Sequence, residues 1–162
     1  MALFGRSRTA VGAGVLATLL LVLIFGNQIF TEWVDRHSRG DTVWGWFLRE
    51  LVWPRWWLTP RDGSGAAARE LLADDLKAIL VILFTALILS VAVKSVTGGG
   101  GAFILGWASL IFGAALAAFA TEFLTSEPTL LHALQATSAG TSYGLWVGWI
   151  VGIATASGKR GG

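Results

Sequence analysis

The segment 138–157 reads SAGTSYGLWVGWIVGIATAS and carries a glycine at every fourth position from residue 140. The series is Gly140, Gly144, Gly148 and Gly152, and Ala156 continues it. In water, each glycine inside a helix costs about 1 kcal/mol relative to alanine, so this segment would be a poor helix there. In lipid, backbone polar groups must be paired within the segment, and a row of small residues lets a second helix approach closely. The segment therefore predicts a transmembrane helix with a close-packing face, which we call the glycine ladder.

The composition of the whole chain agrees with a membrane environment. Of its 162 residues, 54% are hydrophobic and 14% are charged, whereas soluble domains carry about 25% charged residues. The net charge of +2 is small and no basic stripe is present, which argues against a nucleic-acid partner. The chain has no cysteine, so disulfides, thiolate metal sites and cysteine nucleophiles are excluded. Arginine outnumbers lysine, which hints at a GC-rich prokaryotic genome.

Four apolar segments are long enough to cross a bilayer, which takes about 20 residues of helix. They cover residues 10–30, 78–96, 102–121 and 138–156. The first is longer than the apolar core of a signal peptide and no small-residue cleavage motif follows it, so we expect an anchor that is not removed. We therefore predict an all-α integral membrane protein with four transmembrane helices, which forms a single membrane domain over residues 1–162.

Glycine and proline signals divide these segments. Gly98–Gly101 is a run of four consecutive glycines, and we expect it to be a tight turn that joins the second and third spans into a hairpin. Ser126 and Pro128 give a helix-start signal. They predict a short surface helix, Glu127–Ala136, ahead of the last span.

The connection between the first two spans, residues 31–77, holds six of the nine tryptophans. Asp41 can cap a helix that runs from Thr42 to Trp53 and ends at Pro54. Indoles and arginines in such a segment are typical of a helix that lies in the membrane interface. We predict that these tryptophans are interfacial anchors, with docking of a partner protein and lipid or glycan handling as the alternatives. The six are Trp33, Trp44, Trp46, Trp53, Trp56 and Trp57.

Four spans place both termini on the same side of the membrane. On that side, basic residues lie close to the span ends, whereas those of the connection 31–77 are spread out and balanced by acidic residues. The density near the span ends predicts a cell-membrane protein with both termini in the cytoplasm, although a raw count of basic residues favours the opposite orientation. The terminal-side basic residues are Arg6, Arg8, Lys94, Lys159 and Arg160.

The glycine ladder has two interpretations. It can pack inside the protein, against a stripe of small residues in the third span, or it can receive a second copy of the chain or another protein. The stripe consists of Ser109, Gly113, Ala117 and Thr121, which are also four residues apart.

No residue pattern points to catalysis or to ion-coupled transport. The spans hold no charged residue near their centres, where transporters usually need one. His37 has Glu32, Asp35 and Asp41 nearby, but without the spacing of a metal site. His132 lies at a predicted membrane boundary with Glu122. We therefore predict no catalytic residue, no metal and no cofactor.

These observations predict a non-enzymatic protein that works by association. Its partners would be membrane lipids together with a protein partner or a second copy of the chain. The role would be that of an accessory, scaffold or assembly subunit of a membrane complex, or of a homo-oligomer. A component of a channel or transporter, whose path forms only on oligomerisation, is the main alternative. A membrane-surface enzyme that uses the boundary histidines and acids is a third.

Overall fold

The computed structural model describes residues 2–38, 42–59, 64–124 and 129–160. Within these ranges the chain forms six α-helices, one short 3₁₀-helix and no strand. In chain order these are α1 (Ala2–Phe25), α2 (Gln28–His37), α3 (Val43–Leu51), α4 (Gly65–Ala92), η1 (Val93–Ser95), α5 (Gly98–Glu122) and α6 (Leu130–Arg160).

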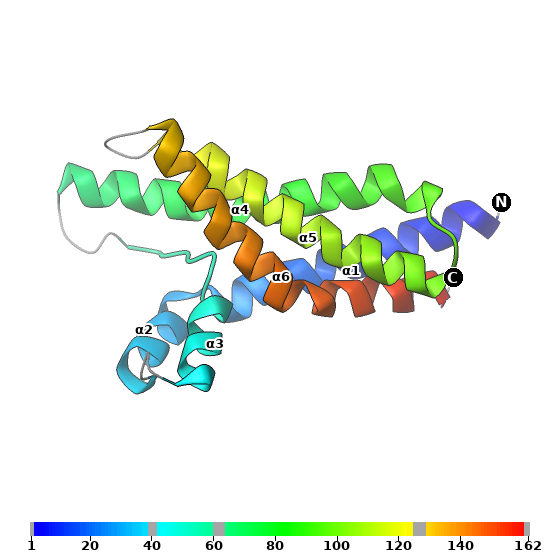
Figure 1. Cartoon of the computed structure of the whole chain (residues 1–162), viewed down its shortest axis with the longest axis horizontal. Helices are drawn as coiled ribbons and strands as arrows, with labels where there is room; N and C mark the ends of the chain where they lie inside the picture. The colour runs from blue at the N-terminus through cyan, green and yellow to red at the C-terminus, as the bar shows by residue number, and fades with distance from the viewer. Residues whose placement is uncertain (1, 39–41, 60–63, 125–128, 161–162) are drawn as a thin grey trace.

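The four long helices lie side by side as a closed bundle (Figure 1). Helix α5 packs between α4 and α6, and α1 closes the bundle by packing against both α6 and α4. Helices α1 and α6 run antiparallel, because Gly158 near the end of α6 lies against Thr9 near the start of α1. Both termini therefore lie at one end of the bundle, whereas α2 and α3 lie beside the other end (Figure 1).

Two helical stretches are long and apolar enough to cross a membrane. They are Gly65–Ser95 and Gly98–Glu122, which correspond to the second and third predicted spans. The described apolar part of α1, Thr9–Phe25, is shorter, and α6 does not meet the same criterion. An all-helical chain with two helices that could span a membrane is therefore the part of the predicted fold that the structure supports.

The predicted first span, residues 10–30, is wrong at its end. Helix α1 stops at Phe25, and Asn27 donates from Nδ2 to the carbonyl of Ile24 at 2.6 Å. The Oδ1 atom of Asn27 also accepts from the backbone N–H of Phe30 at 2.9 Å, which makes Asn27 the N-cap of α2. One asparagine thus pairs carbonyls at the end of α1 and N–H groups at the start of α2.

The prediction that Gly98–Gly101 is a turn is also wrong, because these glycines form the first turn of α5. The chain reverses its direction just before these glycines, through η1 and Val96. Gly98 has φ +74°, a conformation that favours glycine. Lys159 supports this reversal from α6, because its Nζ atom donates to the carbonyls of Val93 (3.1 Å) and Val96 (2.6 Å). A cation that pairs the last carbonyls of a helix stabilises that end.

Two further boundaries differ from the predictions. Helix α6 is continuous from Leu130, so the surface helix expected over Glu127–Ala136 is not separate from the last span. Helix α3 begins at Val43 with Thr42 as its N-cap and ends at Leu51, two residues before Trp53. The expected capping residues Asp41, Ser126 and Pro128 lie outside the described residues.

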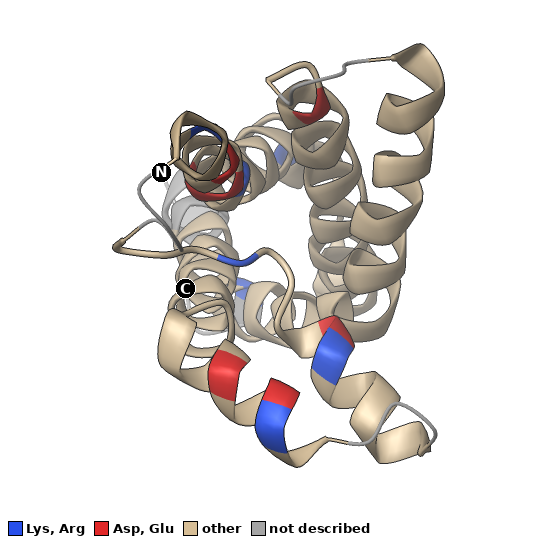
Figure 2. Ribbon diagram, turned by 90° about the vertical axis from the view of Figure 1, so that its left-hand side faces the viewer, with Lys and Arg blue, Asp and Glu red and all other residues tan. Residues whose placement is uncertain are grey.

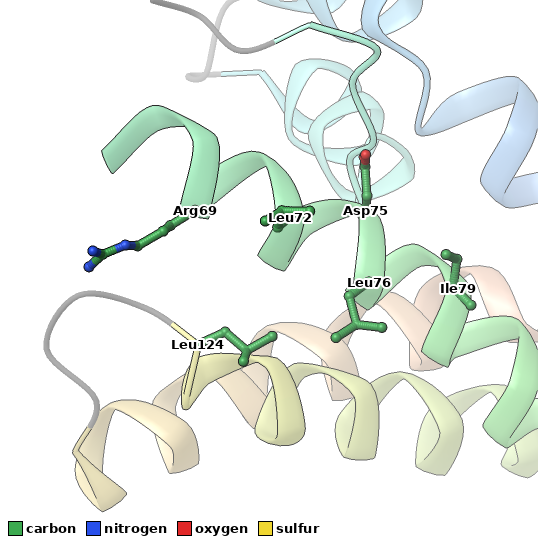
Figure 3. Close-up of a pocket in the computed structure, with 6 residues that line it drawn as sticks. All are labelled: Arg69, Leu72, Asp75, Leu76, Ile79 and Leu124. Carbon is green, nitrogen blue, oxygen red and sulfur yellow. The ribbon is translucent and has the colours of Figure 1, made fainter. Parts of the chain in front are cut away.

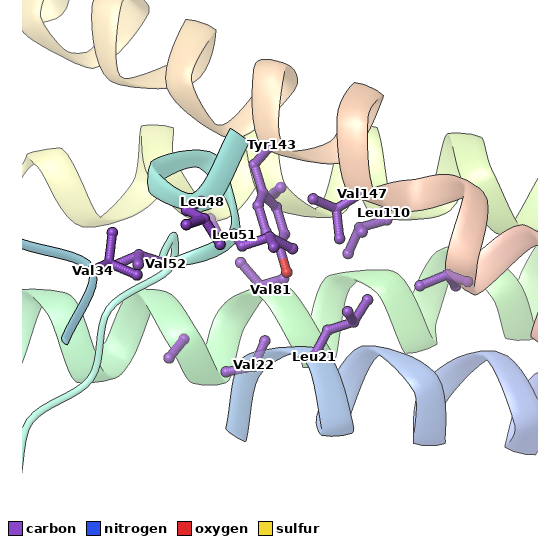
Figure 4. Close-up of a cluster of buried hydrophobic side chains, with 14 residues drawn as sticks. Leu21, Val22, Val34, Leu48, Leu51, Val52, Val81, Leu110, Tyr143 and Val147 are labelled. Atoms are coloured by element: carbon purple, nitrogen blue, oxygen red, sulfur yellow. The ribbon is translucent and has the colours of Figure 1, made fainter. Parts of the chain in front are cut away.

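A cluster of buried apolar side chains joins the helices of the bundle (Figure 4). Tyr143 of α6 is 1% exposed, and its ring extends from α6 toward Val81 of α4 and Leu21 of α1. Leu48 and Leu51 of α3 reach the same cluster from the side. The cluster therefore fixes α3 to the bundle through apolar contacts.

Candidate functional site

The glycine ladder lies against α5 along its whole length. A Cβ atom at Gly140 would overlap the backbone of Ala114, and one at Gly144 would overlap the backbone of Ile111. These two glycines therefore allow the two helix backbones to touch. Ala156, the last member of the series, is half-buried.

The second half of the ladder lies against aromatic rings as well as backbone. A Cβ atom at Gly148 would lie 2.6 Å from Cδ1 of Trp107, and one at Gly152 would lie 2.7 Å from the carbonyl oxygen and 2.9 Å from Cδ2 of Phe103. The Nε1 atom of Trp107 also donates to the carbonyl of Leu145 at 3.0 Å. The ladder therefore brings the two backbones together along its length and, in its second half, also leaves room for two rings.

Two members of the predicted partner stripe, Ser109 and Gly113, contact α4 instead of the ladder. A Cβ atom at Gly113 would lie 2.5 Å from Oγ1 of Thr85, so this part of α5 packs against α4. The Thr85 hydroxyl donates to the carbonyl of Ser109 at 3.5 Å, and the Ser109 hydroxyl is buried without a hydrogen-bond partner among the described residues. Ala117 and Thr121 are buried, and the Thr121 hydroxyl donates to the carbonyl of Ala117 at 2.9 Å.

Thr155 marks the point where three of the long helices meet. Its hydroxyl occupies the space that a Cβ atom would take at Gly14 of α1 or at Gly106 of α5, 2.5 Å away in each case. The hydroxyl donates to the carbonyl of Val151 at 2.8 Å, so the buried polar group is paired within its own helix. Sequence reasoning missed Gly14, Gly106 and Thr155, because single glycines in an apolar helix do not show which partner fills the space.

The six tryptophans predicted as interfacial anchors divide into two groups. Three fasten the connection to the bundle. Trp53 packs on Tyr143 with ring centroids 5.1 Å apart, the Trp56 indole donates to the carbonyl of Val22 at 3.0 Å, and the Trp57 backbone N–H donates to Asp75 at 3.0 Å. The other three, Trp33, Trp44 and Trp46, are 46%, 67% and 38% exposed. The second group is the more exposed of the two, since Trp53, Trp56 and Trp57 are half-buried.

Helix α3 docks on α6 through one face. Trp46 meets Trp146 edge to face with centroids 5.2 Å apart, and Glu50 one turn later accepts a hydrogen bond from Ser142. Burial raises the pKa of the Glu50 carboxyl above its usual 4.5, and the Ser142 hydroxyl opposes this shift in part. The other charged group of α3, Arg49, donates to the carbonyl of Ser38 at 3.3 Å.

A large groove lies between α3, α5 and α6, and we call it the aromatic groove. Its volume is about 1080 Å³, at the upper end of the range of ligand pockets. The rings of Phe103 and Trp107, which the ladder seats, form the α5 wall. The other walls are Val43, Trp44, Trp46 and Phe47 of α3 and Leu145, Trp146 and Trp149 of α6.

The aromatic groove has no charged lining residue, but it is rich in hydrogen-bond donors. An indole N–H can only donate. The indoles of Trp44, Trp46, Trp146 and Trp149 have no acceptor among the described residues. The sequence signal for this site was present in Phe103 and Trp107, which share the four-residue spacing of the ladder, but their pairing with α3 needed the fold.

A smaller cavity, of about 430 Å³, lies between the first half of α4 and the end of α5 (Figure 3). Leu76 and Leu124 face each other across it, whereas the Arg69 guanidinium extends away from this apolar wall. Asp75 also lines the cavity, but its carboxylate holds the backbone of Trp57. This cavity therefore has an apolar wall and no free polar group that converges on its centre.

Whereas Lys94 and Lys159 lie at the end of the bundle that holds the termini, the described acidic residues and several of the described basic ones lie toward the end that holds α2, α3 and the start of α4 (Figure 2). Two local ion pairs lie there, Arg36 with Glu32 at 2.8 Å and Lys77 with Asp74 at 3.0 Å. His37, which was considered above as a metal ligand, stacks on Trp33 with ring centroids 5.2 Å apart. In the described part of the chain, no group of three histidine or acidic side chains is placed to hold a metal ion.

Comparisons with known proteins found no match to this chain. No protein-family description, no curated protein and no solved structure matches the chain.

Proposed function

We propose that this chain is an integral membrane protein whose four long helices cross the bilayer, and that it works by association and not by catalysis. Its role would be that of an accessory or assembly subunit of a membrane complex, or of a homo-oligomer. Both termini would lie in the cytoplasm, and α2 and α3 would lie at the opposite membrane surface.

The observation that carries the proposal is the outer surface of the bundle. No charged residue occurs in 9–25, 78–93, 98–121 or 133–158. Large apolar side chains in these stretches point outward, such as Leu16 (55% exposed), Leu83 (52%), Phe112 (60%) and Ile153 (50%). In the most apolar stretch of α4 only 28% is buried inside the protein, and in that of α5 only 44% is buried. Water would disfavour so much exposed hydrocarbon, whereas lipid would accept it.

The same surface supports α1 and α6 as additional spans. At about 1.5 Å per residue, the four long helices are about 36 to 46 Å long, enough for a hydrocarbon core of about 30 Å. Helix α6 is less apolar in composition because its ladder glycines and Thr155 face α5 and α1, not the surroundings. Its exposed apolar side chains include Leu145, Trp146, Trp149 and Ile153.

The surface that favours association is the one formed by α2 and α3. Because the ladder is covered by α5, it does not offer a free face in the single chain. In contrast, Ile29 is 82% exposed, Val43 85% and Trp44 67%. Tryptophan is enriched among the residues that dominate the energetics of protein contacts.

Single-cysteine labelling tests the membrane arrangement, because the chain has no cysteine of its own. Ser95→Cys and Leu58→Cys place thiols at opposite ends of the bundle, and Leu83→Cys places one on the outer face of α4. In sealed vesicles, a membrane-impermeant maleimide should label only one of the first two and should not label Leu83→Cys. Labelling of both end positions from the same side would contradict the four-span arrangement.

Association is tested by gentle solubilisation of a tagged chain and by cross-linking in the native membrane. The variant Ile29→Ala/Trp33→Ala should lose the co-purifying partner or the self-association product. Leu87→Ala, on the outer face of α4, is the matched control and should retain it. Equal recovery from both variants would show that α2 is not part of the contact surface.

A further inference from the structure

We infer that the aromatic groove is a binding site for a phospholipid, with one acyl chain lying between α3, α5 and α6. This inference rests on the proposed placement of the bundle in a bilayer. It adds a ligand of defined chemistry to a site that is separate from the exposed surface of α2.

The walls of the groove are built and held in place from three directions. Trp107 is fixed to α6 by its hydrogen bond to the Leu145 carbonyl and by the space that Gly148 leaves for its ring. Phe103 packs edge to face against Trp107 with centroids 5.7 Å apart. Trp46 of α3 packs against Trp146 of α6 and joins the remaining walls. A groove with fixed walls loses little conformational entropy when it binds an occupant.

The charge of the groove matches an uncharged chain. None of its lining residues is ionisable. The nearby charges of α3 are engaged elsewhere, since Arg49 donates to Ser38 and Glu50 accepts from Ser142. A charged headgroup would therefore find no counter-charge inside the groove, whereas hydrocarbon would be favoured by the apolar walls.

The unpaired indole donors of the groove favour a lipid over a protein helix as its occupant. Four of its indoles have N–H donors without acceptors among the described residues. A transmembrane helix offers few free acceptors, because its backbone carbonyls are paired along the helix. The ester carbonyls of a phospholipid are acceptors with no competing donor, and they lie where an acyl chain meets its headgroup. Indoles favour this depth of the membrane because one end of the ring is apolar and the other can donate.

Native mass spectrometry of the detergent-purified full chain, with palmitoyl-oleoyl phosphatidylcholine added, tests the inference. The parent protein should retain a single phospholipid after collisional removal of detergent. The variant Trp146→Ala/Trp149→Ala should lose it. Ile153→Ala, exposed on the same helix but outside the groove, is the matched control and should retain it.

A second variant separates loss of the groove from loss of the fold. Trp146→Phe/Trp149→Phe keeps apolar rings in both walls and should retain more phospholipid than the alanine variant at equal helix content. Equal retention by the alanine variant and by Ile153→Ala would overturn the inference, as would retention in the phenylalanine variant no higher than in the alanine variant. A lipid-free dimer that cross-links through Trp149→Cys would assign the groove to a second copy instead.

The same preparation distinguishes this inference from the proposed function. If the chain floats with lipid vesicles and resists alkaline extraction but retains no phospholipid in detergent, only the lipid site is wrong. If the chain stays soluble without any amphiphile, the membrane placement itself is wrong.

Discussion

Helix α6 makes two contacts of very different construction, one with α5 and one with α3. At the α5 contact, glycines bring the backbones of α5 and α6 together at Ala114 and Ile111. At the α3 contact, large rings meet edge to face and a carboxylate meets a hydroxyl, and Trp46 remains 38% exposed. The comparison teaches that one helix can carry a closely packed structural face and a more open aromatic face. Substitutions on α6 should therefore separate stability from binding.

The largest effect is expected from Gly144→Leu, which breaks the closely packed face. The new side chain would have to displace the backbone of Ile111, because even its Cβ atom has no room. We expect a loss of about 3 kcal/mol, measured as a lower thermal midpoint of unfolding in mild detergent. Gly12→Leu in α1 is the control, because no atom lies within 4 Å of a Cβ atom at this position. Equal stability of the two variants would contradict the close backbone contact.

A smaller loss is expected from Gly148→Ala, which lies where the closely packed face meets the groove. The methyl group would push Trp107 away from α6 and weaken its hydrogen bond to the Leu145 carbonyl. We expect a cost of about 1–2 kcal/mol. In a Trp107→Ala background the same substitution should cost much less, so a double-mutant cycle measures the coupling. Additive losses would show that Gly148 does not seat this ring.

Trp46→Ala tests the open face. It removes the edge-to-face pair with Trp146, which is worth about 1 kcal/mol. The thermal midpoint should fall less than for Gly144→Leu, while retention of phospholipid should fall more. A stability loss as large as that of Gly144→Leu would mean that α3 belongs to the structural core and not to an adjustable surface.

The smallest effect is expected from pH, through Glu50. Burial raises the pKa of this carboxyl in the folded protein above its usual 4.5, so the folded state binds the proton more tightly than the unfolded state. Stability should therefore rise as the pH falls through the raised pKa toward 4.5, and this contribution should be lost as the pH rises again. Glu50→Gln should flatten the profile of thermal midpoint against pH. Ser142→Ala should steepen it, because the opposing hydrogen bond is removed.

Part of the fold follows from the sequence alone. The apolar segment 102–121 lies within α5, and the segment 78–96 lies in α4 up to Ala92, because long apolar runs determine where such helices form. Helix ends were harder to predict. The run Gly98–Gly101 is helical although glycine disfavours helix. Helix α6 also differs from its predicted start, because it is continuous from Leu130.

The candidate site was less predictable than the helices. The ladder marks a face of α6, but α5 has small residues on more than one face, so spacing alone could not choose between Gly113 and Ala114 as its neighbour. The aromatic groove needs α3 beside α6, and these helices are far apart in the sequence. Spacing within one helix carries no information about such a contact.

The contact between α1 and α6 has a consequence for the order in which the bundle is made. Helix α1 is synthesised first, yet it packs more extensively against α6, the last helix, than against α4. The space at Gly14 is shared by Leu89 of α4 and Thr155 of α6, and the backbone of Thr9 lies against Gly158 near the end of α6. The bundle therefore closes only after the last helix has been synthesised.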